Sequence, residues 1–296
     1  MNTTDICFPS NKVADIIRCF HTTLDDKYPK NEVDNFILLL FEKYLNWDHA
    51  KFLINKHTTI NQSSLLNLHW AMKDLEKERP IQHIIGRVEF CGCTIKVTPD
   101  VLIPRPETEE MVNRIITEHR GQSNLSILDL CTGSGCIATA LSKNLDKASV
   151  TAVDISSKAV SVALENAEAN KQRIRFITAD ILNSGIEDIL GNQKYDIIVS
   201  NPPYVCDNER KKMRNNVLMY EPHIALFVPD DNPLLFYKTI VDLSKILLKD
   251  NTSQLVVEIN ETKSEEVQAL MSTNGLSPQL LYDFRGVPRC VSAHKK

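Results

Sequence analysis

Four consecutive residues, Asn201-Pro202-Pro203-Tyr204, carry groups that could hold a planar amide or amine. The side-chain oxygen of Asn201 and the backbone carbonyl of Pro202 can each accept one N–H of such a group. Both prolines fix φ and donate no N–H, so they keep these acceptors aimed. Tyr204 adds an aromatic face on which a planar group can stack. The tetrapeptide therefore favours a loop that holds a nitrogen nucleophile.

An amide nitrogen is a poor nucleophile because its lone pair is delocalised. Two acceptors on its N–H groups would hold it in place and let it pyramidalise toward an electrophile. No strong base is needed before attack, since the nitrogen becomes acidic only as it gains the new group. Positioning alone can contribute about 7 to 11 kcal/mol to such a reaction.

A glycine-rich loop follows the apolar run at residues 127–130, and it consists of Cys131, Thr132, Gly133, Ser134 and Gly135. Glycine permits a tight turn and close approach of a ligand to the backbone. Asp154 follows the next apolar run and could accept hydrogen bonds from ribose hydroxyls. Asp180 and Ile181 follow the third run and could border a base. These residues predict a nucleotide-cofactor site.

The same glycine loop also fits a dinucleotide fingerprint. Gly133-x-Gly135-x-x-Ala138, with Asp154 downstream, satisfies G-x-G-x-x-G/A followed by an acidic residue. An NAD-linked protein is therefore an alternative, but it would leave residues 201–204 without a role.

The region after residue 100 alternates apolar runs typical of buried strands with runs of helical periodicity. This alternation predicts a parallel, doubly wound α/β sheet with helices on both faces, a Rossmann-like fold. The last two strands lie too close together for a parallel crossover, so we expect an antiparallel hairpin at one edge. Strands are expected at residues 126–130, 149–153, 173–178, 195–200, 254–258, 279–283 and 289–293, and helices at 136–144, 158–169, 233–248 and 264–273.

The first eighty residues contain no glycine and carry apolar residues at three- and four-residue steps. This pattern predicts a small helical domain over residues 1–85. Its helices are expected at 14–24, 32–45, 50–54 and 63–76. An alternating stretch with a central Gly92 predicts a connecting β-hairpin over residues 86–100, and the remaining domain covers residues 101–296.

Composition is that of an ordinary globular protein, with 24% charged residues among 296 and a net charge of -4. The eight cysteines show no C-x-x-C spacing, so neither a metal site nor a disulfide framework is expected. No run approaches the roughly 18 apolar residues of a membrane span. We expect a reduced, cytoplasmic monomer without membrane contact, metal or stable nucleic-acid binding.

Two smaller features have a structural and a functional interpretation. The basic run Arg210-Lys211-Lys212 could contact nucleic acid, but a solvated helix face is the simpler interpretation. Cys91 and Cys93 could bind metal, but two strand residues are the simpler interpretation.

In these motifs the chain resembles the HemK/PrmC family of S-adenosylmethionine-dependent methyltransferases. The likeness covers nearly the whole chain. Besides the glycine loop and residues 201–204, it includes residues 80–86 with Glu89 and Phe90, residues 102–109 and residues 221–227. The Pro-Arg-Pro-Glu-Thr-Glu and Glu-Pro-His segments are the narrower signatures.

The resemblance implies a class I methyltransferase fold and methylation of the side-chain N5 of the glutamine in the Gly-Gly-Gln motif of class I peptide chain release factors, a protein methylation linked to translation termination. S-adenosylmethionine would be the cofactor. Its methionine part would contact Cys131 to Gly135, its ribose Asp154 and its adenine Asp180 and Ile181. Asn201 would contact the cofactor as well as the substrate. Asn201 to Tyr204 would bind the glutamine, with catalytic roles for Asn201, Pro202 and Tyr204. The helical domain would help dock the protein substrate.

Two alternatives stay open at this point. An adenine-N6 DNA or RNA methyltransferase could grip a flipped base with the same four residues, although the acidic balance of the chain argues against it. A non-catalytic cofactor-binding scaffold is the other alternative. The chain departs from the family pattern at Cys131 and at Asn260, where the family commonly has glycine. Arg105 could orient the cofactor carboxylate or the release-factor backbone, but a rigid Pro-Arg-Pro linker is the simpler interpretation. His223 could pair with Glu221, but capping a loop over the site is the simpler interpretation.

Overall fold

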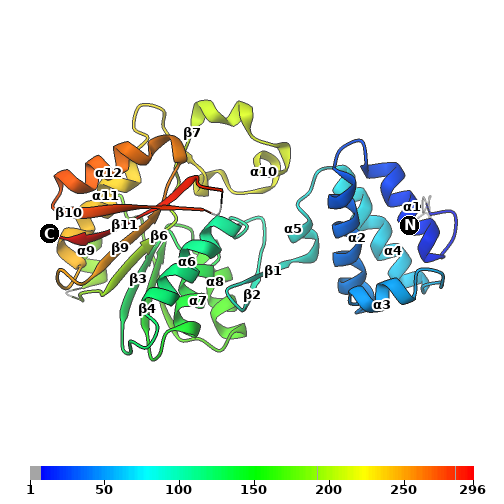
Figure 1. Ribbon diagram of the computed structural model, residues 1–296, viewed down its shortest axis with the longest axis horizontal. Helices are drawn as coiled ribbons and strands as arrows, with labels where there is room; N and C mark the ends of the chain where they lie inside the picture. Colours follow the sequence, from blue (N-terminus) through cyan, green and yellow to red (C-terminus); the bar gives the residue numbers. More distant parts are fainter. Residues whose placement is uncertain (1–7, 192, 284) are drawn as a thin grey trace. The chain divides into compact units, whose positions relative to one another are not determined.

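The computed structural model describes residues 8–191, 193–283 and 285–296, and the chain divides into two compact units (Figure 1). One unit comprises the residues up to Gly86 together with Asn215–Tyr220. The other comprises Arg87–Arg214 and Glu221–Lys296. The first seven residues of the predicted helical domain lie outside the described residues.

The amino-terminal unit is helical, as predicted, and the four expected helices begin within two residues of their predicted starts. They are α1 (Val13–Leu24), α2 (Lys30–Leu45), α3 (His49–Ile54) and α4 (Gln62–Glu76). Side chains of Asp48 and Asn61 cap α3 and α4 by accepting from backbone N–H groups. A short fifth helix, α5 (Ile81–Ile85), was not predicted. It ends at Gly86, whose φ of 83° suits a helix terminus.

A segment distant in sequence completes this unit. Helix α10 (Asn215–Tyr220) belongs to it although the chain on either side belongs to the other unit. The hydroxyl of Tyr220 donates to the backbone carbonyl of Lys77 at 2.9 Å, and the side-chain amide of Asn215 donates to Glu78 at 3.1 Å. The chain that follows the Asn-Pro-Pro-Tyr loop therefore contributes to both units.

The predicted hairpin is confirmed as β1 (Arg87–Phe90) and β2 (Cys93–Lys96), which pair antiparallel. Cys91 and Gly92 form its two-residue turn with φ of 47° and 74°, as a type I′ turn requires. The expectation that Cys91 is a strand residue was wrong for this reason, whereas Cys93 lies in the strand as expected. Burial raises the pKa of the Cys91 thiol to about 12.

The second unit is built on a seven-stranded sheet with the order β10-β11-β9-β6-β3-β4-β5. Strands β3, β4, β5, β6 and β9 are parallel, whereas β11 runs antiparallel to both β9 and β10. The predicted edge hairpin is therefore confirmed as β10 and β11. The bounds are β3 (Ser126–Leu130), β4 (Ser149–Asp154), β5 (Ile174–Thr178), β6 (Ile197–Ser200), β9 (Gln254–Glu258), β10 (Leu276–Tyr282) and β11 (Pro288–Lys295).

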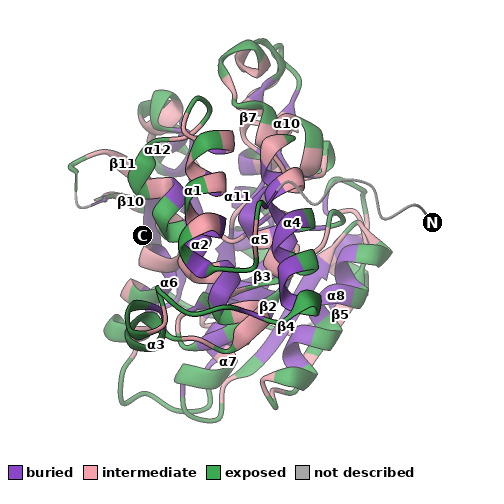
Figure 2. Cartoon of the chain, turned by 90° about the vertical axis from the view of Figure 1, so that its right-hand side faces the viewer, coloured by how far each residue is buried: buried purple, intermediate pink, exposed green. Residues whose placement is uncertain are grey.

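Helices cover both faces of this sheet, which confirms the doubly wound α/β prediction (Figure 1). Successive strand residues such as Ile127 and Leu128 point into two different cores, since side chains alternate along a strand. Buried residues concentrate on the strands and on the helix sides that face them (Figure 2). The helices are α6 (Pro106–Glu118), α7 (Cys136–Asn144), α8 (Ser157–Ala169), α9 (Ile186–Leu190), α11 (Leu235–Leu247) and α12 (Ser264–Thr273).

Helix α6 was not predicted, because the Pro-Arg-Pro segment was interpreted as a rigid linker. Pro106 is the first residue of the helix, where its missing N–H costs nothing. Glu107 and Glu109 lie in the first turn, where negative charge suits the helix dipole. The helix brings Thr108 into the core with 2% of its surface exposed.

The chain between β6 and α11 consists of short pieces. Arg210 in the basic run pairs with Asp207 at 3.0 Å, and its guanidinium stacks 4.0 Å above the Phe227 ring. This arginine is thus engaged within the fold. The pieces are β7 (Val205–Cys206), η1 (Asp207–Lys212), η2 (His223–Ala225) and β8 (Phe227–Val228), and η3 (Glu261–Lys263) follows β9.

Candidate active site at the carboxyl edge of the sheet

A cavity of about 240 Å³ lies where parallel strands of the second unit end. The strand order places β6, β3, β4 and β5 side by side, so the loops after these four strands converge at one edge. Most of the predicted site residues meet at this cavity. Those that line it are Cys131, Thr132, Gly133, Ser134, Asp154, Asp180, Ile181, Asn201 and Pro203. Gly135, Pro202 and Tyr204 do not line it.

The glycine loop is held by backbone hydrogen bonds to the neighbouring strand. Thr132 N–H donates to the carbonyl of Val153 at 2.9 Å, and Gly133 N–H donates to the carboxylate of Asp154 at 2.8 Å. A Cβ on Gly133 would meet no atom within 4 Å, so this backbone borders open space. A ligand can therefore approach the loop closely at Gly133.

Gly135 has a packing role instead. A Cβ at this position would lie 2.8 Å from the Cβ of Ala163 in α8, and its φ is 73°. The glycine thus lets α7 and α8 approach each other. Buried Asn166 on α8 supports the same loop by donating to the carbonyls of Ser134 at 2.9 Å and Lys96 at 3.0 Å.

Cys131, one of the two departures from the family pattern, has a backbone geometry that favours the glycine common in the family. Cys131 has a φ of 61°, a region that glycine occupies readily and other residues occupy at a cost. Cys131 is half-buried, and desolvation of its thiol raises its pKa above the ordinary value. A cysteine at this position therefore lines the cavity as a neutral thiol.

Asp154 is fixed by two backbone donors, Gly133 N–H at one oxygen and Ser156 N–H at the other. Burial raises the pKa of this carboxyl, and these hydrogen bonds lower it. A carboxylate offers about four acceptor positions, so two remain for a ligand. Asp180 is oriented similarly, since its Oδ1 accepts from Leu182 N–H at 2.9 Å. Ile181 beside it is 4% exposed.

The Asn-Pro-Pro-Tyr loop is held by side chains from distant segments. Asn201 Nδ2 donates to the hydroxyl of Thr108 at 3.1 Å, and Thr108 in turn donates to Glu258 at 2.6 Å. The hydroxyl of Tyr204 donates to the other oxygen of Glu258 at 2.9 Å. Burial, followed by the charge of Glu258, raises the pKa of Tyr204 well above its ordinary value. The tyrosine hydroxyl is therefore an anchor of this loop.

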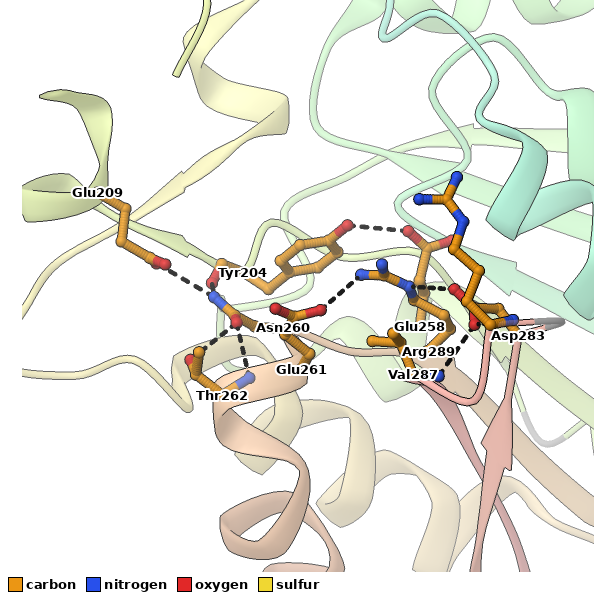
Figure 3. A network of polar contacts seen from close by, with 10 residues as sticks. Tyr204, Glu209, Glu258, Asn260, Glu261, Thr262, Asp283, Val287 and Arg289 are labelled. Atoms are coloured by element: carbon orange, nitrogen blue, oxygen red, sulfur yellow. Dashed lines mark hydrogen bonds and ion pairs between the residues drawn. The ribbon is translucent and has the colours of Figure 1, made fainter. Parts of the chain in front are cut away.

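Asn260 holds the backbone that follows Tyr204 (Figure 3). Its Nδ2 donates to the Tyr204 carbonyl at 3.4 Å and to Glu209 at 3.1 Å, and Glu209 accepts from Cys206 N–H at 2.8 Å. Its Oδ1 accepts from the backbone and hydroxyl of Thr262. The residue that departs from the family pattern at the end of β9 thus has a defined set of contacts.

A buried ion pair joins the two narrow signature segments at the cavity. Arg105 contacts Glu221 at 2.5 Å, and the other oxygen of Glu221 accepts from Ile103 N–H at 3.0 Å. The Glu221 side chain is 1% exposed, whereas that of Arg105 is 32% exposed. His223 packs edge-on against Phe227 with ring centroids 5.3 Å apart. These contacts support the structural interpretation of both residues.

Three residues with polar contacts in this site were not selected from the sequence, namely Thr108, Glu258 and Asn260. A usable signal existed for Glu258, because a lone carboxylate ends an apolar strand run just as Asp154 does. Thr108 carried no comparable signal. Its role depends on α6 placing it beside two residues far away in sequence.

Two negative findings apply to the described part of the chain. No group of three or more histidine, cysteine, aspartate or glutamate side chains there could hold a metal ion. In the same residues, no helix is both long enough and apolar enough to cross a membrane.

Comparisons with known proteins agree with this geometry. Residues 16–86 match the PrmC N-terminal domain and residues 109–223 match the methyltransferase small domain. The release factor glutamine methyltransferase of Flavobacterium psychrophilum is 40% identical over 279 residues, covering 93% of this chain and 96% of that protein. The protein of the same name from Bacteroides thetaiotaomicron is 37% identical over 286 residues, covering 96% and 100%.

A solved structure shows the same fold at low identity. The T. thermophilus 16S rRNA N2 G1207 methyltransferase RsmC, in complex with AdoMet and guanosine, has a TM-score of 0.51 and 16% identity. The likeness covers 71% of this chain and 50% of that chain. The fold is that of the class I S-adenosylmethionine-dependent methyltransferases, as predicted, and S-adenosylmethionine is the cofactor of this enzyme class. With relatives of this identity over nearly its full length, the chain belongs to the release factor glutamine methyltransferase family.

Proposed function

We propose that this enzyme transfers the methyl group of S-adenosylmethionine to the side-chain N5 of the glutamine in the Gly-Gly-Gln motif of class I peptide chain release factors. The observation that carries the proposal is the placement of Asn201. It lines the cavity at the end of β6, and its Nδ2 is engaged by Thr108. The amide therefore keeps its oxygen as an acceptor for a substrate N–H.

The residues at the cavity fit S-adenosylmethionine. The open backbone at Gly133 provides room for the methionine part, Asp154 retains acceptor positions for ribose hydroxyls, and Ile181 offers apolar contact to adenine. When bound, the cofactor supplies an electrophilic methyl group. The contacts of Cys131 to Ser134, Asp154, Asp180 and Ile181 with the cofactor are part of this proposal.

The chain's own residues would act by positioning the substrate glutamine. Asn201 Oδ1 and the Pro202 carbonyl accept one N–H each, which holds the nitrogen in line with the methyl carbon at about 3 to 3.5 Å. The two prolines are buried and keep the acceptors fixed. Tyr204 supplies a stacking face, and its anchored hydroxyl limits ring rotation. The amide proton leaves after the methyl group has been gained.

The amino-terminal unit is the proposed docking site for the protein substrate. Several of its large apolar side chains are exposed, including Leu66 at 42% and Trp70 at 59%, which lie one turn apart on α4. Trp70→Ala should raise the KM for intact release factor but not for a short Gly-Gly-Gln peptide. Ile246→Ala, which removes a similarly exposed side chain on α11, serves as the control.

A methyl-transfer competition assay tests the function. The enzyme receives labelled S-adenosylmethionine together with purified release factor and adenine-containing DNA or RNA. Labelling of the Gly-Gly-Gln glutamine supports the proposal, whereas labelling of nucleic acid alone supports the adenine-N6 alternative, which the comparisons do not favour. We further expect a cytoplasmic monomer without stable nucleic-acid binding.

A further inference from the structure

Glu258 lies at the end of β9 and is buried, with 2% of its surface exposed. Each of its carboxyl oxygens accepts one hydroxyl hydrogen bond. Oε2 accepts from Thr108 at 2.6 Å, and Oε1 accepts from Tyr204 at 2.9 Å. Figure 3 shows the tyrosine hydroxyl directed at this carboxylate. Burying a carboxylate is costly, so its retention among apolar strand residues calls for a role.

The Glu258 carboxylate determines the direction in which the hydroxyls of Thr108 and Tyr204 point their hydrogens. Burial raises the pKa of the Glu258 carboxyl, and the hydrogen bonds from Thr108 and Tyr204 lower it. In its ionised form the carboxylate can only accept, so Thr108 then directs its single hydrogen toward Glu258. The Thr108 oxygen is then left as an acceptor, and it can pair only with the NH₂ side of the Asn201 amide. Contact through Asn201 Oδ1 would leave two facing acceptors. The orientation of the asparagine amide thus follows from the hydrogen bond that Thr108 donates to Glu258.

We propose that Glu258 is a positioning residue for methyl transfer, acting through Thr108 on the Asn201 amide and directly on the Tyr204 hydroxyl. The inference rests on the proposed function, because it concerns the acceptor that Asn201 presents to the substrate amide. Glu258 itself lines no part of the cavity, whereas Thr108 and Asn201 do. Its effect is therefore transmitted through hydrogen bonds to residues that contact the site.

The contacts of Glu258 distinguish this role from ordinary support of the loop. Asn260, two residues later, holds the backbone after Tyr204 but makes no hydrogen bond to Thr108 or Asn201 within the described residues. The end of β9 thus holds the loop in two ways. Asn260 holds the loop backbone, whereas Glu258 orients the functional side chains. Only the second should determine the direction of the Asn201 acceptor.

The test measures kcat, KM and the Kd for S-adenosylmethionine in the full-length enzyme with intact release factor. Glu258→Gln keeps the shape of the side chain but places an NH₂ group against one of the two hydroxyls. Thr108→Val keeps the shape and removes the hydroxyl. We expect each variant to lose about 10- to 100-fold in kcat, with the cofactor Kd within about twofold of wild type.

Two further variants separate positioning from structural support. Thr108→Ser keeps the hydroxyl and should retain kcat within about threefold. The double variant Thr108→Val/Glu258→Gln should be no slower than the worse single variant, because residues that act as one unit are non-additive. If Glu258→Gln fails to fold, the Thr108→Val and Thr108→Ser pair still decides the outcome.

The two proposals fail in different ways. Glu258→Gln or Thr108→Val with wild-type kcat, or losses that multiply in the double variant, would overturn the positioning role while the proposed function stands. A wild-type enzyme that binds S-adenosylmethionine but labels no Gly-Gly-Gln glutamine would overturn the proposed function, and the positioning role with it.

Discussion

The loops after β4 and β6 line the same cavity but are held by different kinds of contact. Asp154 at the end of β4 is oriented by backbone N–H groups of Gly133 and Ser156 in adjacent loops. Asn201 after β6 depends on the side chain of Thr108, 93 residues earlier, and Tyr204 depends on Glu258, 54 residues later. The proposed cofactor side is thus built from backbone, whereas the proposed substrate side is built from side chains.

This difference has a physical consequence. Backbone donors persist when side chains change, so the proposed cofactor side should tolerate many substitutions that leave the chain path intact. A hydrogen bond between side chains is lost when either partner changes. Substitutions around Asn201 should therefore affect turnover more than cofactor affinity.

The largest expected effect is that of Asn201→Ala. Loss of an aligned polar group that acts in the transition state lowers kcat by about 10²- to 10³-fold. The Kd for S-adenosylmethionine should change little, because the backbone contacts around Asp154 are untouched. Single-turnover kinetics and calorimetric titration of the cofactor measure the two quantities. A parallel loss of both would contradict the division into two sides.

A matched pair of glycine substitutions comes next. Gly135→Ala places a Cβ 2.8 Å from Ala163 at a positive φ, so it should lower the free energy of unfolding by about 2 to 3 kcal/mol. Gly133→Ala has a φ of 55° but no atom within 4 Å, so it should cost about 1 kcal/mol.

Cofactor binding should show the opposite order for this pair. Gly133→Ala places its methyl group in the open space beside the loop and should weaken S-adenosylmethionine binding more than Gly135→Ala does. Urea denaturation and cofactor titration on both variants provide the comparison. The same order in both measurements would argue against separate packing and binding roles for the two glycines.

Asp129 at the end of β3 should give the enzyme a measurable pH dependence of stability. Burial raises the pKa of this carboxyl to about 7, and the hydrogen bond from Thr132 only partly offsets it. The folded state then binds more protons than the unfolded state between pH 4 and 7. The contribution of this group to stability is complete below about pH 4 and is lost as pH rises, by about 1.4 kcal/mol per pH unit.

Asp129→Asn removes that titration and is the control for it. As pH rises toward 7, the unfolding free energy of the wild type should fall relative to that of the variant. Urea denaturation at several pH values measures it. If the difference in unfolding free energy stays constant with pH, Asp129 does not titrate between pH 4 and 7 in the folded enzyme.

The smallest expected effect is that of Asn260→Ala. It removes hydrogen bonds to the Tyr204 carbonyl and to Glu209, which should cost about 1 kcal/mol of stability. Turnover should fall by less than with Glu258→Gln, because the Asn201 amide keeps its orientation. Thermal unfolding and kcat are the measurements. A loss of turnover larger than that of Glu258→Gln would shift the positioning role to Asn260.

Much of the fold could be predicted because its signals are local. Period-two and period-3.6 apolar patterns identified the strands of the large sheet and most of the long helices, and Gly92 marked the hairpin turn. Short helices such as α5 and α10 gave too few periods to detect. Helix α6 was missed because the Pro-Arg-Pro segment in which it begins is typical of a linker as much as of a helix start.

By itself, the sequence determined which residues stand at the carboxyl ends of parallel strands, and that rule was enough to bring Cys131, Asp154, Asp180 and Asn201 to one cavity. It could not show that Gly135 serves helix packing. Nor could it show that Thr108 joins the Asn201 amide to Glu258 by hydrogen bonds. Those contacts join segments that are separated by many residues, and side-chain hydrogen bonds across such distances leave no spacing pattern. Only the tertiary structure decides them, because it alone sets which side chains lie within 3 Å of each other.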